Sequence, residues 1–173
     1  MSYIKIAIIN ASTMVNDADA TAVVAALQTQ VSRDFAPAWG IDATLRLVPK
    51  GGKPEKGEWW LTLLDDSDQA SALGYHDLTK SGLPSGKVFV KSSQSSHVHW
   101  SVTASHEVLE MLVDPNINLT VFEQSSKGSR LYAYEVCDAC EGDDYAYKID
   151  GVLVSDFVYP AWFESFRKKG STR

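Results

Sequence analysis

Short β-branched and aromatic runs alternate with one helical pattern in the N-terminal half of the chain. Residues 3–10 alternate in polarity and are rich in isoleucine, which predicts a buried strand. Apolar residues at helical spacing predict a helix over about 18–35, which we expect Pro37 and Gly40 to end. The same criteria predict four more strands, the third of them at a sheet edge: 43–48, 59–64, 73–78 and 87–91.

The C-terminal half begins with a second helical pattern. Its apolar positions predict a helix over about 100–113, and Asp114-Pro115 stops it because the residue before a proline disfavours helical backbone. Hairpin-like strands follow, and Asp150-Gly151 predicts a tight turn between the last two. The aromatic segment 159–163 should pack back on the body, and 168–173 should form a frayed tail. The predicted strands are 119–122, 131–136, 145–149 and 152–157.

This order of elements predicts an α+β fold in which the central helix backs the sheet. The chain has 173 residues, which is within the range of one domain, and we treat residues 1–173 as a single unit. Residues of about 1–115 should form the sheet and helices, and residues of about 116–165 a small β-rich lobe. A cleft is expected between the sheet edge and this lobe.

Composition and charge exclude several classes of partner. The net charge is -6, and no basic block is long enough to follow a phosphate backbone, so we expect no nucleic-acid partner. No apolar run is long enough to span a bilayer, and the first residues do not have the pattern of a signal peptide. We therefore expect no membrane partner and a location in the cytoplasm or in a virus particle.

The two cysteines form a single Cys-x-x-Cys motif, Cys137 to Cys140. One such pair cannot supply a four-thiolate zinc site, and the strand-then-helix context of a redox motif is missing. We expect two reduced thiols, with a local disulfide as the alternative.

The predicted central helix carries the residues with the clearest chemistry. His106 and Glu110 are four positions apart, so both side chains leave the same helix face and can reach one cation. Glu107 is rotated from His106 by about 100° and can lie beside that cation without binding it, as a base that takes a proton from water. Carboxylate and imidazole groups are both competent zinc ligands.

A simpler interpretation is that Glu110 is a solvated helix residue and that His106 is a helix-surface histidine with a neighbouring acid, Glu107. Against it, the predicted helix contains no lysine or arginine, so neither acid has a partner of opposite charge within the helix. Two unpaired acids and one histidine on one helix favour a cation from outside.

A third protein ligand is expected from a segment downstream of the helix. Glu135 is the first choice because it lies in an otherwise apolar and aromatic run, where an unpaired carboxylate would be costly. Asp138, at the start of the following turn, is the second choice. Asp114 fits a turn at the helix end better. His97 and His99 would point to one side of a strand, where two ring nitrogens can bind a metal, but such a pair is more often a polar strand edge.

Several stretches of the chain resemble the zincin metallopeptidases, and more closely a group of uncharacterised zincin-like proteins from bacteria and phages. The resemblance covers most of the chain after about residue 70. The stretches that carry it are 72–77 (Ala-Leu-Gly-Tyr-His-Asp), 105–115 (which contains His-Glu-Val-Leu-Glu), 134–138, 150–151 and 154–163.

The resemblance implies a zincin-like fold with a mixed sheet, an N-terminal helix and a central active-site helix. It assigns His106 as first ligand, Glu107 as general base and Glu110 as second ligand. Glu110 replaces the histidine that usually ends this motif. The cofactor implied is Zn²⁺, although oxygen-rich ligation also admits harder divalent ions such as manganese.

We consider three functions. The first is a metal-dependent peptidase whose peptide or protein substrate adds a strand beside residues 75–77, with Tyr134, Tyr159 or His76 stabilising the oxyanion. The second is a catalytically weak or inactive zincin-fold structural or adaptor protein, possible in a virus particle with an assembly partner. The third is a binding domain without a metal.

Overall fold

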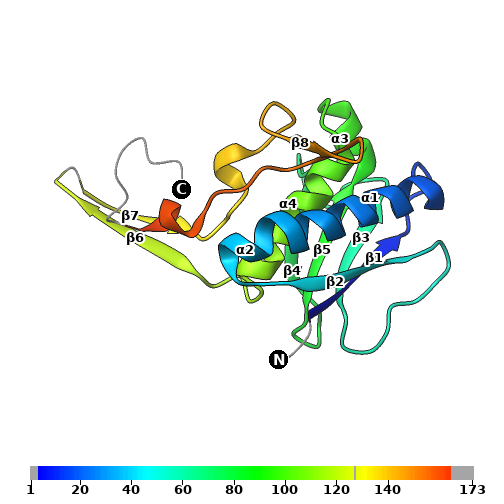
Figure 1. The fold of residues 1–173 in the computed structure, drawn as a ribbon, viewed down its shortest axis with the longest axis horizontal. Helices are drawn as coiled ribbons and strands as arrows, with labels where there is room; N and C mark the ends of the chain where they lie inside the picture. The colour runs from blue at the N-terminus through cyan, green and yellow to red at the C-terminus, as the bar shows by residue number, and fades with distance from the viewer. Residues whose placement is uncertain (1–3, 127, 165–173) are drawn as a thin grey trace.

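Five strands form one mixed sheet, which Figure 1 shows below the helices. The computed structural model describes residues 4–126 and 128–164. The strand order is β2-β1-β3-β5-β4; neighbours are parallel except β4, which pairs antiparallel with β5 and forms an edge. This confirms the predicted α+β class with a mixed sheet and the predicted edge strand. The strands are β1 (Ile4–Asn10), β2 (Ala43–Val48), β3 (Trp59–Leu64), β4 (Gly74–Leu78) and β5 (Pro84–Phe89).

The first helical region continues further than the sequence pattern predicts. Helix α1 (Asp17–Thr29) begins at Asn16, whose side chain accepts a hydrogen bond from the Asp19 N–H. A π-helical turn, η1 (Gln30–Phe35), and a short helix, α2 (Ala36–Trp39), then follow without a break. The prediction that Pro37 ends the helix was wrong, because Pro37 lies in the first turn of α2, where its missing N–H is not needed.

Gly40 ends this region as predicted. Its φ of 70° lies in the left-handed region, and its N–H donates to the Ala36 carbonyl. None of the helices in the described ranges combines the length and the apolar character that a bilayer crossing requires.

The fifth strand begins three residues earlier and ends two residues earlier than the predicted range 87–91. Strand β5 begins at Pro84, because antiparallel pairing with β4 extends to the Leu78–Pro84 pair, and a proline is tolerated at the first position of a strand. It ends at Phe89, and helix α3 (Val90–Ser95) starts directly after it. This helix was missed because its polar sequence has no apolar period.

Helix α4 (Trp100–Val113) has the predicted bounds and is enclosed on almost all sides. Every residue except Trp100 and His106 is buried, since α4 packs between β4 and β5 on one side and β9 on the other (Figure 1). The apolar residues Val108 and Leu109 contribute to the main core with the strands. Enclosure on both sides makes α4 the element on which the sheet and the C-terminal segment meet.

The C-terminal part consists of two separate hairpins and two short 3₁₀ turns. The β6–β7 hairpin, β6 (Thr120–Ser125) and β7 (Gly128–Ala133), projects from the body (Figure 1), whereas β9 (Val152–Val154) lies against α4 and α1 and pairs with β8 (Tyr147–Ile149). The predicted turn at Asp150-Gly151 is confirmed, with φ values of 48° and 85°. The 3₁₀ turns are η2 (Asp138–Cys140) and η3 (Pro160–Phe163).

Two strands end earlier than predicted, at Ala133 instead of 136 and at Val154 instead of 157. Tyr134 leaves the hairpin because its ring stacks on Phe163 at a centroid distance of 4.0 Å, which also places the aromatic end segment on the body as predicted. Val136 is then held by the Val158 N–H, which donates to its carbonyl at 2.8 Å. The predicted tail at 168–173 lies outside the described residues.

An ion pair whose carboxylate is buried joins β2 to the residue before β3. The Arg46 guanidinium donates two hydrogen bonds of 2.6 Å to the carboxylate of Glu58, whose side chain is 2% exposed. These bonds outweigh the effect of burial and lower the pKa of Glu58, with help from the Glu55 N–H.

We predict that Arg46→Gln lowers the free energy of unfolding at pH 7 by about 1–2 kcal/mol, after discounting for solvent around Arg46. Because the Glu58 pKa is lowered on folding, its contribution is present above the ordinary value of 4.5 and is lost as pH falls through the folded-state pKa. Urea unfolding at several pH values measures this, and the difference between variant and parent should shrink in acid. Arg33→Gln, which removes an exposed pair with Asp34, is the control.

Candidate metal centre

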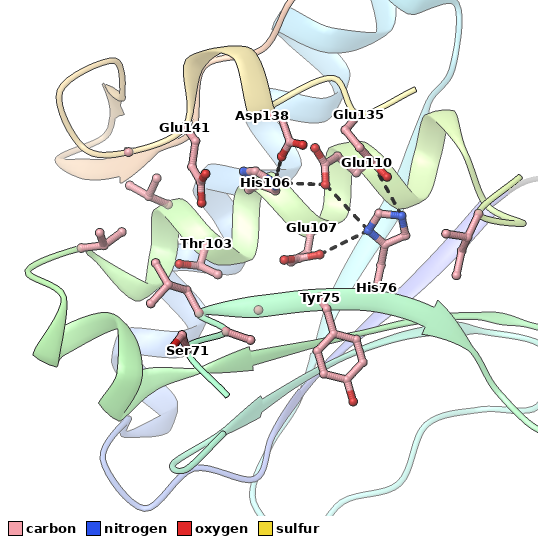
Figure 2. Close-up of a pocket in the computed structure, with 17 residues that line it drawn as sticks. Ser71, Tyr75, His76, Thr103, His106, Glu107, Glu110, Glu135, Asp138 and Glu141 are labelled. Atoms are coloured by element: carbon pink, nitrogen blue, oxygen red, sulfur yellow. Dashed lines mark hydrogen bonds and ion pairs between the residues drawn. The ribbon is translucent and has the colours of Figure 1, made fainter. Parts of the chain in front are cut away.

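A cleft of about 610 Å³ opens between α4, strand β4 and the segment that follows β7 (Figure 2). It lies at the position predicted from the order of elements. Seven of the residues that line it are titratable acids or histidines, and none of the described lining residues is a lysine or an arginine. The seven are His76, His106, Glu107, Glu110, Glu135, Asp138 and Glu141.

A buried polar network fixes the helix turn that presents His106. The Ser105 hydroxyl donates to Gln30 Oε1 at 2.6 Å and accepts from the Ser155 N–H at 3.0 Å. The Gln30 amide donates in turn to the Ser155 carbonyl at 2.7 Å. All three residues are fully buried. The network therefore connects α4 to the π-helical turn and to the chain after β9, and it sets the rotation of α4 about its axis.

His106 and Glu110 point toward one another as the helical spacing predicts. His106 Nε2 lies 3.0 Å from Glu110 Oε2 and 3.4 Å from Asp138 Oδ1 (Figure 2). The two helix side chains are 12% and 4% exposed. Burial alone would lower the pKa of His106, but Asp138 and Glu110 outweigh it and raise this pKa to about 11. The interpretation of Glu110 as a solvated residue was wrong, because the enclosed helix leaves it buried.

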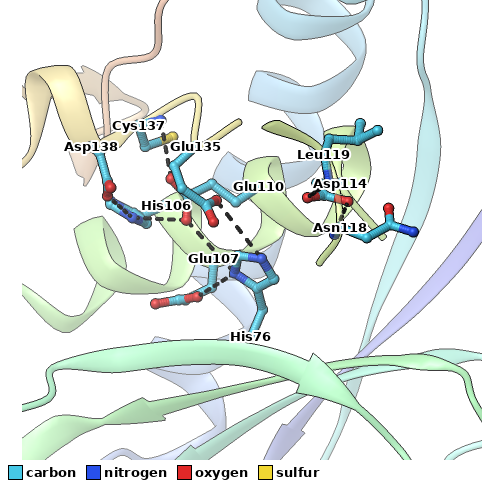
Figure 3. Close-up of polar contacts among 10 residues, drawn as sticks. All are labelled: His76, His106, Glu107, Glu110, Asp114, Asn118, Leu119, Glu135, Cys137 and Asp138. Carbon is cyan, nitrogen blue, oxygen red and sulfur yellow. Dashed lines mark hydrogen bonds and ion pairs between the residues drawn. The ribbon is translucent and has the colours of Figure 1, made fainter. Parts of the chain in front are cut away.

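Glu110 also contacts the segment that follows β7. Its Oε1 accepts a hydrogen bond of 3.2 Å from the Cys137 N–H (Figure 3). One nitrogen, one oxygen and one sulfur of His106, Glu110 and Cys137 lie within 4.8 Å of one another, which is a set of donors that zinc accepts. Burial raises the pKa of the Cys137 thiol, so without a cation it is neutral. Both cysteines are free thiols, as predicted.

Glu107 lies on the side of the cleft next to β4. Its Oε2 is 3.3 Å from His76 Nδ1, and its Oε1 lies above Gly74, where an added Cβ would come within 2.6 Å of that oxygen. A glycine at this position lets strand and helix approach closely. Burial raises the pKa of Glu107, and this effect exceeds the opposing ones of His76 and His106.

The two candidates for a third ligand reach different parts of the cleft. Asp138 contacts His106, whereas Glu135 Oε2 lies 3.8 Å from His76 Nε2. Both line the same cavity. Burial first and the charge of Glu110 second raise the pKa of Glu135 to about 7, while hydrogen bonding to His106 lowers the pKa of Asp138.

Other side chains singled out in the sequence lie elsewhere. Asp114 caps the turn after α4 as predicted, accepting from the N–H groups of Asn118 and Leu119 (Figure 3). His97 and His99 lie on the connection before α4 and not on a strand; His97 is exposed, and the ring of His99 bonds to Asp143. Neither Tyr134 nor Tyr159 is among the described residues that line the cleft.

Two residues at the cleft, Cys137 and His76, were not predicted as metal ligands from the sequence. Cys137 was considered only as half of the Cys-x-x-Cys pair and not as a single thiolate ligand, although it lies between Glu135 and Asp138 in the sequence. His76 was predicted only as one of three candidates for stabilising the oxyanion, not as a metal ligand. Its place on a predicted edge strand, where alternate side chains face the backing helix, was a usable signal.

Comparison of the chain with models of protein families, with curated protein sequences and with solved structures gives no match. The resemblance to zincins therefore stays a prediction.

We predict that Ser105→Ala destabilises the protein by about 2 kcal/mol, because Gln30 Oε1 and the Ser155 N–H lose their buried partner. Thermal and urea unfolding measure the change. Ser95→Ala, which removes an exposed hydroxyl on α3, is the matched control. Equal effects of the two substitutions would show that the buried network does not hold α4.

Proposed function

We propose that this protein is a divalent-cation-dependent peptidase that uses zinc, with manganese as an alternative, bound by His106, Glu110 and Asp138. The observation that carries the proposal is the convergence of these three side chains in one cleft, with the buried carboxyl of Glu107 beside them. Cys137, whose sulfur lies within 4.8 Å of the donor atoms of His106 and Glu110, would complete the ligand set. The mixed sheet with an edge strand beside α4 supports the zincin-like part of the proposal.

When bound, the cation would polarise the scissile carbonyl and make a water molecule more acidic. The chain supplies a proton acceptor in the carboxyl of Glu107, which is buried beside the cleft and whose pKa is raised by that burial. Its contact with His76 and its position above Gly74 hold the carboxyl facing the cleft. Glu107 can thus take a proton from water and transfer it to the leaving amine.

Strand β4 supports a peptide as substrate. It is the edge of the sheet, and the residues just before and within it, from Ser71 to His76, line the cleft (Figure 2). An extended peptide can add to such an edge by backbone hydrogen bonds. A cavity of about 610 Å³ is within the usual size of ligand sites.

One observation favours an adaptor role as a second candidate function. The β6–β7 hairpin projects from the body and exposes the cross-strand neighbours Phe122 and Leu131, at 60% and 70%. Exposed apolar side chains of this size fit a protein partner. Purified protein that binds a cation yet hydrolyses no member of a broad peptide library would favour this second function.

We predict that zinc stabilises the chelator-treated protein, by about 2.7 kcal/mol at a concentration 100 times the dissociation constant. His106→Gln should remove most of this stabilisation because it deletes the nitrogen donor of the site. Differential scanning fluorimetry with added zinc measures the shift. His97→Asn, which removes an exposed imidazole, is the control. Absence of a zinc-dependent shift in the parent protein would refute the cation site.

We predict that Glu107→Gln lowers peptide hydrolysis by about 10²–10⁴-fold, because glutamine cannot accept the proton. Zinc content and melting temperature should stay nearly unchanged. Cleavage of a peptide library, followed by mass spectrometry, measures activity, and elemental analysis measures zinc. Glu123→Gln, on the exposed hairpin, is the matched control. Unchanged hydrolysis in Glu107→Gln would exclude Glu107 as the base.

A further inference from the structure

Two buried polar atoms face one another in the cleft without a hydrogen bond. In the described part of the chain, four buried side-chain atoms have no hydrogen-bond partner: Asn10 Oδ1, Trp60 Nε1, His76 Nε2 and Glu135 Oε2. The last two lie 3.8 Å apart. Unsatisfied buried atoms are rare in native proteins, and a facing pair indicates a shared ligand.

The opposite side of the His76 ring is already occupied. Nδ1 lies 3.3 Å from Glu107 Oε2 and 3.7 Å from Glu110 Oε2 (Figure 3). Carboxylates only accept hydrogen bonds, so Nδ1 carries a proton, and loss of the other ring proton frees the lone pair of Nε2 for a metal ion. A histidine that binds a metal through one nitrogen commonly donates to a carboxylate through the other. The surroundings of His76 have this arrangement.

The spacing of the two free atoms fits a cation between them. Two zinc bonds of about 2.1 Å at a tetrahedral angle place their donor atoms roughly 3.4 Å apart. The observed 3.8 Å needs a shift of a few tenths of an ångström. The His76 side chain is 8% exposed and Glu135 18% exposed, so both donors are buried at the floor of the cleft. A water molecule could donate to both atoms, but it would leave the carboxylate charge uncompensated.

The cleft is also rich in carboxylates, which are good ligands of divalent ions. Five carboxylates line it: Glu107, Glu110, Glu135, Asp138 and Glu141. No lysine or arginine lies among its described lining residues. Glu110 and Asp138 belong to the first proposed cation site, so three carboxylates remain beside it.

We propose that His76 Nε2 and Glu135 Oε2 bind a second divalent cation, zinc or manganese, separate from the one proposed for His106, Glu110 and Asp138. The inference rests on the proposed cation chemistry of the cleft but not on hydrolysis. Because the two ring nitrogens of His76 point away from each other, this position lies on the far side of the ring from Glu107. Glu107 holds the ring through Oε2 and keeps Oε1 for proton transfer.

The test is the number of zinc ions per chain. Chelator-treated protein is titrated with zinc by calorimetry, and the content after desalting is measured by elemental analysis. We expect two equivalents for the parent protein and one for His76→Gln. Glu135→Gln, which keeps the size of the side chain, should also bind one equivalent. His97→Asn should retain two.

Circular dichroism and melting curves establish that each variant is folded, and Glu135→Gln keeps the test valid if His76→Gln does not fold. The inference is overturned if the parent binds one equivalent, or if both variants retain two. Two equivalents without peptide hydrolysis would refute the proposed function and leave this inference standing. Peptide hydrolysis by a parent protein that binds only one equivalent of zinc would support the proposed function and refute this inference.

Discussion

The carboxylate of Glu110 is the point on which the cleft depends. It is 4% exposed and receives an imidazole on one oxygen and a backbone N–H on the other. A buried carboxylate without such partners would be costly enough to be protonated or expelled to the surface. The contact with the Cys137 N–H brings the segment after β7 onto α4, and that segment carries Glu135 and Asp138. One buried charge thus organises the groups around it.

The scaffold beneath this charge is rigid for reasons that are independent of it. Helix α4 is covered by the sheet on one side and by β9 on the other, and the hydroxyl of Ser105 links it to Gln30 and Ser155. These contacts set which face of α4 is turned toward the cleft. Gly74 sets the distance to β4, since a side chain there would meet Glu107. The geometry of the cleft is therefore set by the packing of α4 and β4 as well as by the charges in the cleft.

The sequence predicted those features that depend on local periodicity. The bounds of α4, the edge position of β4 and the turn at Asp150-Gly151 follow from spacing and turn chemistry within a few neighbouring residues. The same helical spacing predicted that His106 and Glu110 would share a face. Helix α3 gave no such signal, because its polar residues have no apolar period and it is placed by the end of β5.

The remaining features depend on contacts between distant parts of the chain. Strand β7 ends at Ala133 because Tyr134 stacks on Phe163, which lies 29 residues later in the sequence. Whether Glu135 or Asp138 approaches His106 then depends on how the released segment docks. Pairing of His76 with Glu107 likewise depends on how closely β4 approaches α4. No local pattern contains this information. The sequence could therefore narrow the candidates for the third ligand to Glu135 and Asp138, but it could not decide between them.

The hydrogen bond from the Val158 N–H to the Val136 carbonyl has a consequence for how the protein reaches its native state. It joins the segment that follows β7, which contains Glu135 and Asp138, to the last stretch of the described chain. The cleft is thus built from an edge strand, a central helix and two late segments that must all be in place together. Such non-local assembly is completed late and all at once. If the cleft binds a cation as proposed above, a metal ion added during refolding binds only those chains in which these segments have come together.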